Sequence, residues 1–324
     1  MDMNEIGGSK AHSNDAGGRS QTRADRNVMQ RQAPGYYRYR VGEIVVTVVT
    51  DGERNAPLDD KFVLNATREE VASALRSSFL PGDRLITFFN PVVLHTESTL
   101  VLIDTGFGQG AFDQTQGAVG QLELNLIAAG IPPEAIDIVA ISHCHPDHVN
   151  GLLKADGKPA FPNARVLVPA EEWKFWSDSQ EKAKALAGRM QMLFQNNLRI
   201  FDALGSAIAT YAWNEEIACG ITSVPTPGHS IGHTSFLVAS GGEQVFIQGD
   251  VAHNPALFVP NPGWHAAIDQ DAETAERTRR RVYDMLAANR LRVQGFHFPF
   301  PGVGHIEEVP TGYRFVPAPW KTSL

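Results

Sequence analysis

Four metal-capable side chains fall within one run of seven residues, and this run constrains the fold and chemistry of the chain more than any other feature. The run reads Ser-His-Cys-His-Pro-Asp-His and contains His143, His145, Asp147 and His148. His143 and His145 are two residues apart, so an extended or loop backbone can aim both rings at one point, while Asp147 and His148 turn toward a second point nearby. Imidazole and carboxylate ligands together suit Zn, Mn, Fe or Co. Room for two such ions is typical of a hydrolase.

The composition is that of an ordinary globular protein, and it argues against several kinds of partner. Of the 324 residues, 43% are hydrophobic and 20% are charged, which is enough to bury a sizeable core. A formal net charge of −8 argues against a nucleic-acid surface, which would need a basic face. No apolar run approaches the roughly 18 residues that span a bilayer. The two cysteines, Cys144 and Cys219, are expected to be reduced thiols in a cytoplasmic protein.

Two regions of different character divide the chain. Residues 1–33 are rich in Gly, Ser, Asn, Asp, Arg and Gln with almost no apolar residues, so we expect a flexible or disordered tail. An arm that packs across a partner subunit is the alternative. The stretch lacks the apolar core of a signal peptide, so export is not expected. Residues 34–324 contain no obvious linker and are expected to form a single catalytic domain.

From residue 34 onward strands and helices alternate, which indicates a layered α/β fold. Thr67 and Glu70 form a capping-box pattern that opens a helix through about residue 79. Residues 136–141 are an apolar strand that delivers the metal-binding run at its carboxyl end. Further helices are expected over residues 121–129, 173–204 (one or two helices) and 272–288, and strands over residues 41–50, 86–94, 99–103, 221–224, 234–238, 244–248 and 293–296.

The remaining ligands must come from distant parts of the chain, and three positions at strand ends are candidates. His229 lies in a Pro-Gly turn that would hold its ring rigidly, Asp250 offers a carboxylate that could bridge two cations, and His297 ends the last strand. One reading of these positions is a matched pair of sites bridged by Asp250 and a water. The two sites would be His143, His145 and His229 for one ion, and Asp147, His148 and His297 for the other.

Five blocks in this order resemble the metallo-β-lactamase superfamily. They are Asp-Thr-Gly at residues 104–106, the metal-binding run at 142–148, Thr-Pro-Gly-His-Ser-Ile-Gly-His at 226–233, Gly-Asp at 249–250, and His297. The resemblance covers essentially residues 34–317. It implies an αβ/βα four-layer sandwich, in which two mixed sheets are flanked by helices and the metals lie at one edge between the sheets.

Within that family the chain is most similar to the methyl parathion hydrolase branch. The segments that carry this similarity lie at residues 33–38, 161–164, 175–176, 300–306 and 312–315. The branch acts on organophosphate triesters and, more generally, on lactones and aryl esters, and it tends to dimerise. The resemblance therefore implies a small-molecule ester, lactone or phosphotriester as substrate, and a homodimer.

The resemblance also implies a mechanism that needs no serine or cysteine nucleophile. Two divalent ions, zinc in the first place with Mn, Co or Fe as alternatives, would supply a bridging hydroxide that attacks a carbonyl or phosphoryl centre. Asp147 and Asp250 are the predicted catalytic residues, because Asp250 bridges the ions and Asp147 could pass a proton to the leaving group. Asp104 is expected to support the metal loop from outside the ligand set, with an ordinary strand-end cap as the alternative.

Three further side chains are candidates for the substrate pocket. His233 either contacts substrate or braces the turn of His229. Trp176 and Phe194 either form an aromatic wall for an aryl leaving group or pack in the core.

Other functions stay open from the sequence. An acyl-homoserine lactone lactonase keeps the same seven ligands, and a mononuclear iron persulfide dioxygenase shares the run and the later His and Asp. β-Lactam hydrolysis is disfavoured because the lactamases of the family lack an equivalent of Asp250. Glyoxalase-II-type cleavage is disfavoured because little chain follows His297. A nuclease is disfavoured by the acidic net charge, and a protein that only binds is disfavoured because all seven ligand positions are filled.

Overall fold

Two seven-stranded sheets form the framework of the computed structural model, which describes residues 33, 35–185 and 187–324. The first sheet has the order β1 (Tyr36–Val41), β2 (Ile44–Val49), β5 (Val92–His95), β6 (Leu100–Ile103), β7 (Ile138–Ala140), β8 (Arg165–Pro169) and β9 (Ile208–Tyr211). The second has the order β10 (Glu216–Ala218), β11 (Ile221–Pro225), β12 (Thr234–Ser240), β13 (Glu243–Ile247), β14 (Arg292–Gln294), β15 (Val303–Val309) and β16 (Gly312–Pro317). A two-stranded sheet pairs β3 (Gly52–Pro57) with β4 (Arg84–Phe89).

Both large sheets are mixed. Strands β6, β7, β8 and β9 pair parallel with one another, while β1, β2, β5 and β6 pair antiparallel in that order. In the second sheet only the β13–β14 pair is parallel. The predicted fold class, two mixed sheets flanked by helices, is confirmed.

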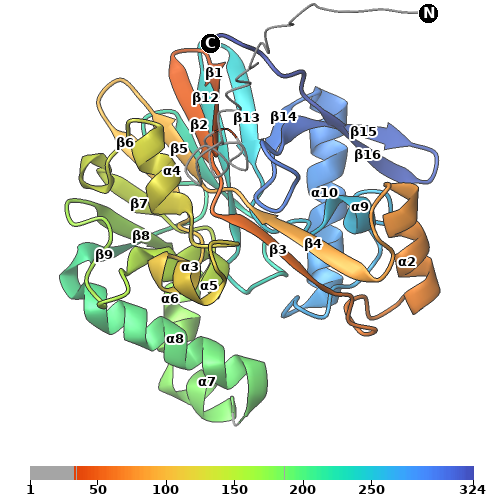
Figure 1. Cartoon of the computed structure of the whole chain (residues 1–324), viewed down its shortest axis with the longest axis horizontal. Coiled ribbons are helices and arrows are strands. Elements are labelled where there is room, and N and C mark those ends of the chain that lie inside the picture. Colours follow the sequence, from red (N-terminus) through yellow and green to blue (C-terminus); the bar gives the residue numbers. More distant parts are fainter. Residues whose placement is uncertain (1–32, 34, 186) are drawn as a thin grey trace, which may run out of the picture. The chain divides into compact units, whose positions relative to one another are not determined.

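Helices cover the outer face of each sheet (Figure 1). On the first sheet, α4 (Leu122–Ala128), α6 (Ala170–Ser177) and α8 (Gly188–Leu204) bury their apolar faces in one hydrophobic cluster. On the second sheet, α2 (Arg68–Ser77), α9 (Pro255–Phe258) and α10 (Ala272–Asn289) contribute to another. The short helices α3 (Gln109–Gln114), α5 (Pro146–Val149) and α7 (Ser179–Lys184) lie in the connections.

A third cluster fills the space between the sheets and holds them together. From the first sheet it takes Val46, Val48 and Leu94, and from the second it takes Phe236 and Val238, all with essentially no solvent exposure. Side chains of successive strand residues point to opposite faces, so each sheet has one apolar face for its helices and another for the partner sheet. The metal-binding loops leave the sheets at the edge of this shared core.

The capping box at the start of α2 is confirmed. The backbone N of Glu70 donates to Oγ1 of Thr67 at 3.3 Å, and the backbone N of Thr67 donates to Oε2 of Glu70 at 2.7 Å. The helix ends at Ser77, close to the predicted end.

Three expected elements are divided differently from the prediction. Residues 86–94 are two strands of different sheets, because Asn90 leaves the ladder and its backbone N donates to the carbonyl of Phe296. Residues 41–50 include a hairpin turn at Gly42, whose φ of +52° suits glycine, so only β2 lies within that range. Residues 173–204 contain parts of three helices rather than one or two.

Two further sequence expectations concern the membrane and the tail. Among the residues that the structure describes, none of the helices combines the length and apolar character needed to cross a bilayer. The predicted tail, residues 1–33, lies outside the described residues except for its last one, and it stays a prediction.

The core between the sheets should tolerate truncation poorly. Replacing Leu94, which is fully buried, by Ala should lower the free energy of unfolding by about 2–5 kcal/mol, because the lost burial leaves a cavity. The matched control is Leu124→Ala, since Leu124 is 56% exposed on α4. Urea unfolding of both variants measures the difference, and equal losses would contradict this description of the core.

Candidate metal centre

The metal-binding run lies in the loop that follows β7 and in the first turn of α5. His145 has an extended backbone and is the N-cap of α5, and Pro146 occupies the first helical position, where its fixed φ suits a helix start. The helix carries Asp147 and His148 in its first turn. His143, His145 and His148 are buried, whereas the Asp147 side chain keeps 18% of its exposure. The three histidine side chains of the run therefore point into the protein, and Asp147 lies on the side that solvent can reach.

The other three residues enter from the second sheet, each just after a strand. His229 lies between β11 and β12, Asp250 follows β13, and His297 follows β14. The His229 turn packs tightly on α10, because a Cβ on Gly228 would lie 2.2 Å from the backbone N of Ala275. Gly228 also has a φ of +129°, so only glycine fits this turn well.

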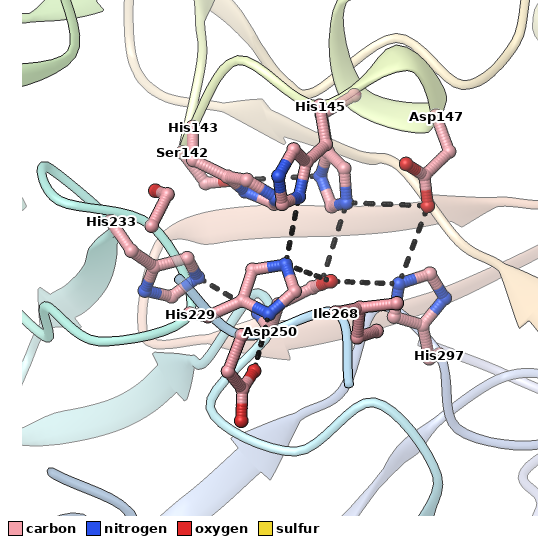
Figure 2. A network of polar contacts seen from close by, with 12 residues as sticks. Ser142, His143, His145, Asp147, His229, His233, Asp250, Ile268 and His297 are labelled. Atoms are coloured by element: carbon pink, nitrogen blue, oxygen red, sulfur yellow. Dashed lines mark hydrogen bonds and ion pairs between the residues drawn. The ribbon is translucent and has the colours of Figure 1, made fainter. Parts of the chain in front are cut away.

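The first triad is formed by His143, His145 and His229. Nε2 of His143 lies 2.9 Å from Nδ1 of His145, and this Nδ1 lies 2.9 Å from Nε2 of His229. Three ring nitrogens thus face one another at one point, as Figure 2 shows.

The second triad is formed by Asp147, His148 and His297. Oδ2 of Asp147 lies 3.5 Å from Nε2 of His297 and 3.6 Å from Nε2 of His148. These three ligand atoms also lie close enough together to hold one ion. These two triads contain the same residues as the two sets that we predict from the sequence.

Asp250 contacts both triads. Its Oδ2 lies 3.2 Å from Nε2 of His229 in the first triad and 3.0 Å from Nε2 of His297 in the second. Its Oδ1 lies 3.4 Å from Nε2 of His148. A carboxylate between two groups of ligands is suited to bridge two ions (Figure 2).

The residues fit divalent metal ions. Five imidazoles and two carboxylates make a donor set that zinc and similar ions prefer. Two of the buried ligand atoms, Nε2 of His148 and Oδ1 of Asp250, have no hydrogen-bond partner among the described residues. Buried polar atoms without a partner are unfavourable, and coordination would satisfy both of them.

The electrostatics differ between the two triads. Burial, and then the neighbouring imidazoles, hold the pKa of His143 and of His145 well below the usual value, so both rings are neutral as ligands must be. Burial also acts to lower the pKa of His148, but the carboxylates of Asp250, Asp104 and Asp147 outweigh it and raise that pKa. The second triad therefore lies in a negative environment that favours bound positive charge.

Two carboxylates orient the ligands from outside. Oδ2 of Asp104 lies 2.8 Å from Nδ1 of His148, and its Oδ1 accepts from the backbone N of Ser142, as expected of a residue that supports the metal loop. Asp104 has a φ of +60°, a strained conformation that often occurs at functional sites. Oδ1 of Asp269 lies 2.8 Å from Nδ1 of His229.

Asp269 is not among the residues that the sequence predicts for the site. It lies in a loop forty residues from His229, and no local pattern marks it. The general tendency of metal-ligating imidazoles to donate their second N–H to a carboxylate was the one available signal. Arg279, which is also buried, lies 3.7 Å from the other oxygen of Asp269 and helps to compensate its charge.

The three residues predicted for the substrate pocket face the interior instead. Trp176 and Phe194 are almost fully buried in the cluster outside the first sheet, with their ring centroids 4.8 Å apart, so the aromatic wall is wrong and the core alternative holds. His233 is also buried. Its Nε2 accepts from the backbone N of Asp250 at 2.9 Å and its Nδ1 lies 3.0 Å from the carbonyl of Thr226. His233 therefore braces Asp250 and its own turn rather than contacting substrate, and burial lowers its pKa to about 3.

Two mixed sheets with His and Asp ligands at their common edge form a site suited to metal-dependent hydrolysis. A family model described as the metallo-beta-lactamase superfamily matches residues 89–288, which is more than half of the chain. The protein belongs to this superfamily.

Its relatives include lactonases. The chain is 27% identical over 264 residues to an N-acyl homoserine lactonase from Bacillus sp, covering 76% of this chain and 92% of the relative. It is 26% identical over the same length to an N-acyl homoserine lactonase from Bacillus cereus, with the same coverage.

Two solved structures are similar over most of the chain. AidC, a dizinc quorum-quenching lactonase in complex with the product N-hexanoyl-L-homoserine, has a TM-score of 0.82 and 25% identity, covering 89% of this chain and 99% of AidC. The hydrolase AbOPH of the beta lactamase superfamily has a TM-score of 0.80 and 29% identity, covering 90% of this chain and all of AbOPH.

The two outer carboxylates should support different metal sites. We expect Asp269→Asn to weaken the ion at the first triad and Asp104→Asn to weaken the ion at the second, each by about 10- to 100-fold, because each removes the acceptor that orients a ligating imidazole. Titration with Zn²⁺ against a chromogenic chelator measures both affinities. Asp202→Asn, on the exposed side of α8, is the control. Two variants that bind metal like the wild type would contradict these roles.

Proposed function

We propose that the protein is a dinuclear zinc hydrolase that opens the ring of N-acyl homoserine lactones. The observation that carries the proposal is the position of Asp250, which contacts His229 of one triad and both histidines of the other. A carboxylate that contacts both triads is suited to bridge two ions, and this favours a dinuclear centre over the single iron of a persulfide dioxygenase.

The choice of substrate rests on the relatives. The two Bacillus relatives are N-acyl homoserine lactonases, and AidC is a dizinc lactonase with an acyl-homoserine product bound. At 25–27% identity this support concerns the class of substrate, and the shape of the pocket sets the preference within the class.

The chain's own residues divide the chemistry between them. Two divalent ions would supply an activated water at neutral pH and a Lewis acid for the lactone carbonyl. Asp250 is buried and keeps both triads at a fixed separation, while His233 holds the backbone of Asp250. Asp147 is the partly exposed member of the set, so its carboxylate is suited to take the proton that the attacking water loses and to hand it to the ring oxygen that leaves.

Loss of the bridging carboxylate should abolish lactone opening. We expect Asp250→Ala to lower kcat/KM for N-hexanoyl homoserine lactone by more than roughly 100-fold. Loss of a residue that only orients a metal ligand costs up to about 100-fold, and Asp250 is itself a predicted ligand. A pH-indicator assay measures the acid released, with Asp202→Ala as the control on an exposed position.

The same assay decides between substrate classes when an aryl ester and a methyl organophosphate triester are run beside the lactone. Faster turnover of the triester would replace the lactonase proposal with the organophosphate hydrolase that the methyl parathion hydrolase resemblance implies. An unchanged Asp250→Ala variant would contradict the dinuclear mechanism.

The remainder of the substrate has a candidate location beside the first triad. A cavity of about 760 Å³ borders the loop of His229 and shares Asp269 with the centre. Its size is typical of small-molecule sites. Its apolar lining includes Phe175, Met190, Ile231 and Ile268. We place the N-acyl chain of the lactone there.

Arg189 lies at the boundary between this cavity and the centre. One guanidinium nitrogen lies 3.5 Å from Nε2 of His145, and another donates to the carbonyl of Ile268 at 2.9 Å. Arg189 lines the cavity and also contacts a ligand of the first triad, so a substrate that reaches from the ions into the cavity can contact its guanidinium. The amide carbonyl of an N-acyl homoserine lactone is an acceptor that Arg189 can bind.

Filling the cavity should select against long acyl chains. We expect Met190→Trp to lower kcat/KM for decanoyl but not butanoyl homoserine lactone, by roughly fourfold for each CH₂ that is displaced from the cavity, or about 0.8 kcal/mol. Met192→Trp is the matched control, because Met192 is 62% exposed on the same helix. Equal effects of the two variants, or of one variant on both chain lengths, would contradict this location.

The homodimer stays a prediction of the resemblance. Light scattering should give twice the mass of one chain.

A further inference from the structure

A fully buried carboxylate outside the ligand set connects the loops of the first triad. Glu172 lies in the first turn of α6 and has no solvent exposure. A glutamate in the first turn of a helix is ordinarily exposed to solvent, and the neighbouring Glu171 is exposed. Glu172 instead points between two loops of the metal centre.

Each oxygen of Glu172 accepts two hydrogen bonds. Oε2 accepts from the backbone N of Cys144 at 2.9 Å and from Nε1 of Trp176 at 2.8 Å. Oε1 accepts from Oγ of Ser230 at 2.6 Å and from the backbone N of Gly232 at 2.7 Å. The four donors compensate the burial of the charge, since hydrogen bonds to an ionised acceptor are about twice as strong as neutral ones.

The donors belong to the loops that carry the first triad. Cys144 lies between His143 and His145, and Ser230 directly follows His229. The Glu172 carboxylate therefore forms hydrogen bonds to both loops that carry the imidazoles of the first triad. The loop of Ser230 also packs closely on α6, because a Cβ on Gly232 would lie 2.5 Å from the backbone N of Glu172.

The second triad is held by other groups. His148 is oriented by Asp104, and Nδ1 of His297 donates to the carbonyl of Phe88 at 2.7 Å. Neither contact involves Glu172. A disturbance at Glu172 should therefore reach the two metal sites unequally.

We propose that Glu172 is a positioning residue that fixes the loop of His143 and His145 against the loop of His229, and thereby sets the metal affinity of the first triad. The inference rests on the proposed dinuclear centre. It assigns Glu172 no contact with substrate or with the ions.

The variant Glu172→Gln separates this role from side-chain volume. Glutamine has the same shape, but its amide NH₂ must face one of the two donor pairs. The Ser230 hydroxyl can rotate to accept from this NH₂, whereas Cys144, Trp176 and Gly232 can only donate there. The variant should therefore keep the bond to Cys144 and release the Gly232 side, which displaces the loop of His229.

The experiment titrates the metal-free protein with Co²⁺ and follows the visible absorption bands of the bound ion, with a competing chelator to obtain each affinity. We expect the wild type to bind two ions. Glu172→Gln should bind the ion of the first triad about 10- to 100-fold more weakly, with a changed absorption spectrum, and the ion of the second triad unchanged. Glu171→Gln, the same substitution one position earlier on the exposed face, should match the wild type in both affinities.

A milder variant covers the case in which Glu172→Gln fails to fold. Ser230→Ala removes one of the four hydrogen bonds and should weaken the same site by a smaller factor. The inference is overturned if folded Glu172→Gln, or Ser230→Ala, binds both ions as the wild type does, or if both sites weaken equally. A wild type that binds one ion would overturn the dinuclear centre together with this inference, so the two failures are distinguishable.

Discussion

The close approach of Asp250 to the imidazoles of both triads is the interaction on which the rest of the site depends. Its carboxylate is nearly fully buried and lies within 3.4 Å of ring nitrogens of His148, His229 and His297. Burial acts to raise the pKa of Asp250, but the imidazoles of His297, His148 and His229 together outweigh it and hold that pKa well below the usual value. Gathering this many polar atoms away from water is costly unless they are paired or bind metal. The supporting groups around the centre have to maintain that arrangement.

The arrangement also depends on both sheets. Four of the seven residues follow β7 in the first sheet, and the other three follow strands of the second. Each triad combines two residues of the first sheet with one of the second, so the assembly of each triad depends on the apolar core between the sheets, to which Leu94 and Phe236 belong. Stability and metal binding are linked through this core, because an ion that binds only the folded protein stabilises it.

Much of the centre could be predicted from the sequence because its signals are local. The spacing of His143 and His145 is a ligand pattern in itself, and His229, Asp250 and His297 each stand where a strand ends. The capping box of Thr67 is similarly local. By contrast, residues 86–94 were predicted as one strand although the chain passes from one sheet to another at Asn90. Both strands are apolar, and nothing in their composition marks the boundary between them.

The supporting residues were harder to find because their partners are distant in sequence. Asp269 acts on a histidine forty residues away, and Glu172 joins loops that lie 28 and about 60 residues from it. An acidic residue on a helix or in a loop ordinarily indicates a solvated surface. The sequence left Trp176 open between the pocket and the core, and in the structure its buried indole Nε1 donates to Glu172 inside the core. Tertiary packing, which no local pattern encodes, decided these cases.

The metal content of the purified wild-type protein, determined by elemental analysis per chain, tests the dinuclear centre most directly. We expect two divalent ions, with zinc predominant, since the two triads and the shared Asp250 offer ligands for two ions. A single iron per chain would contradict this expectation and would move the protein to the oxygenase alternative.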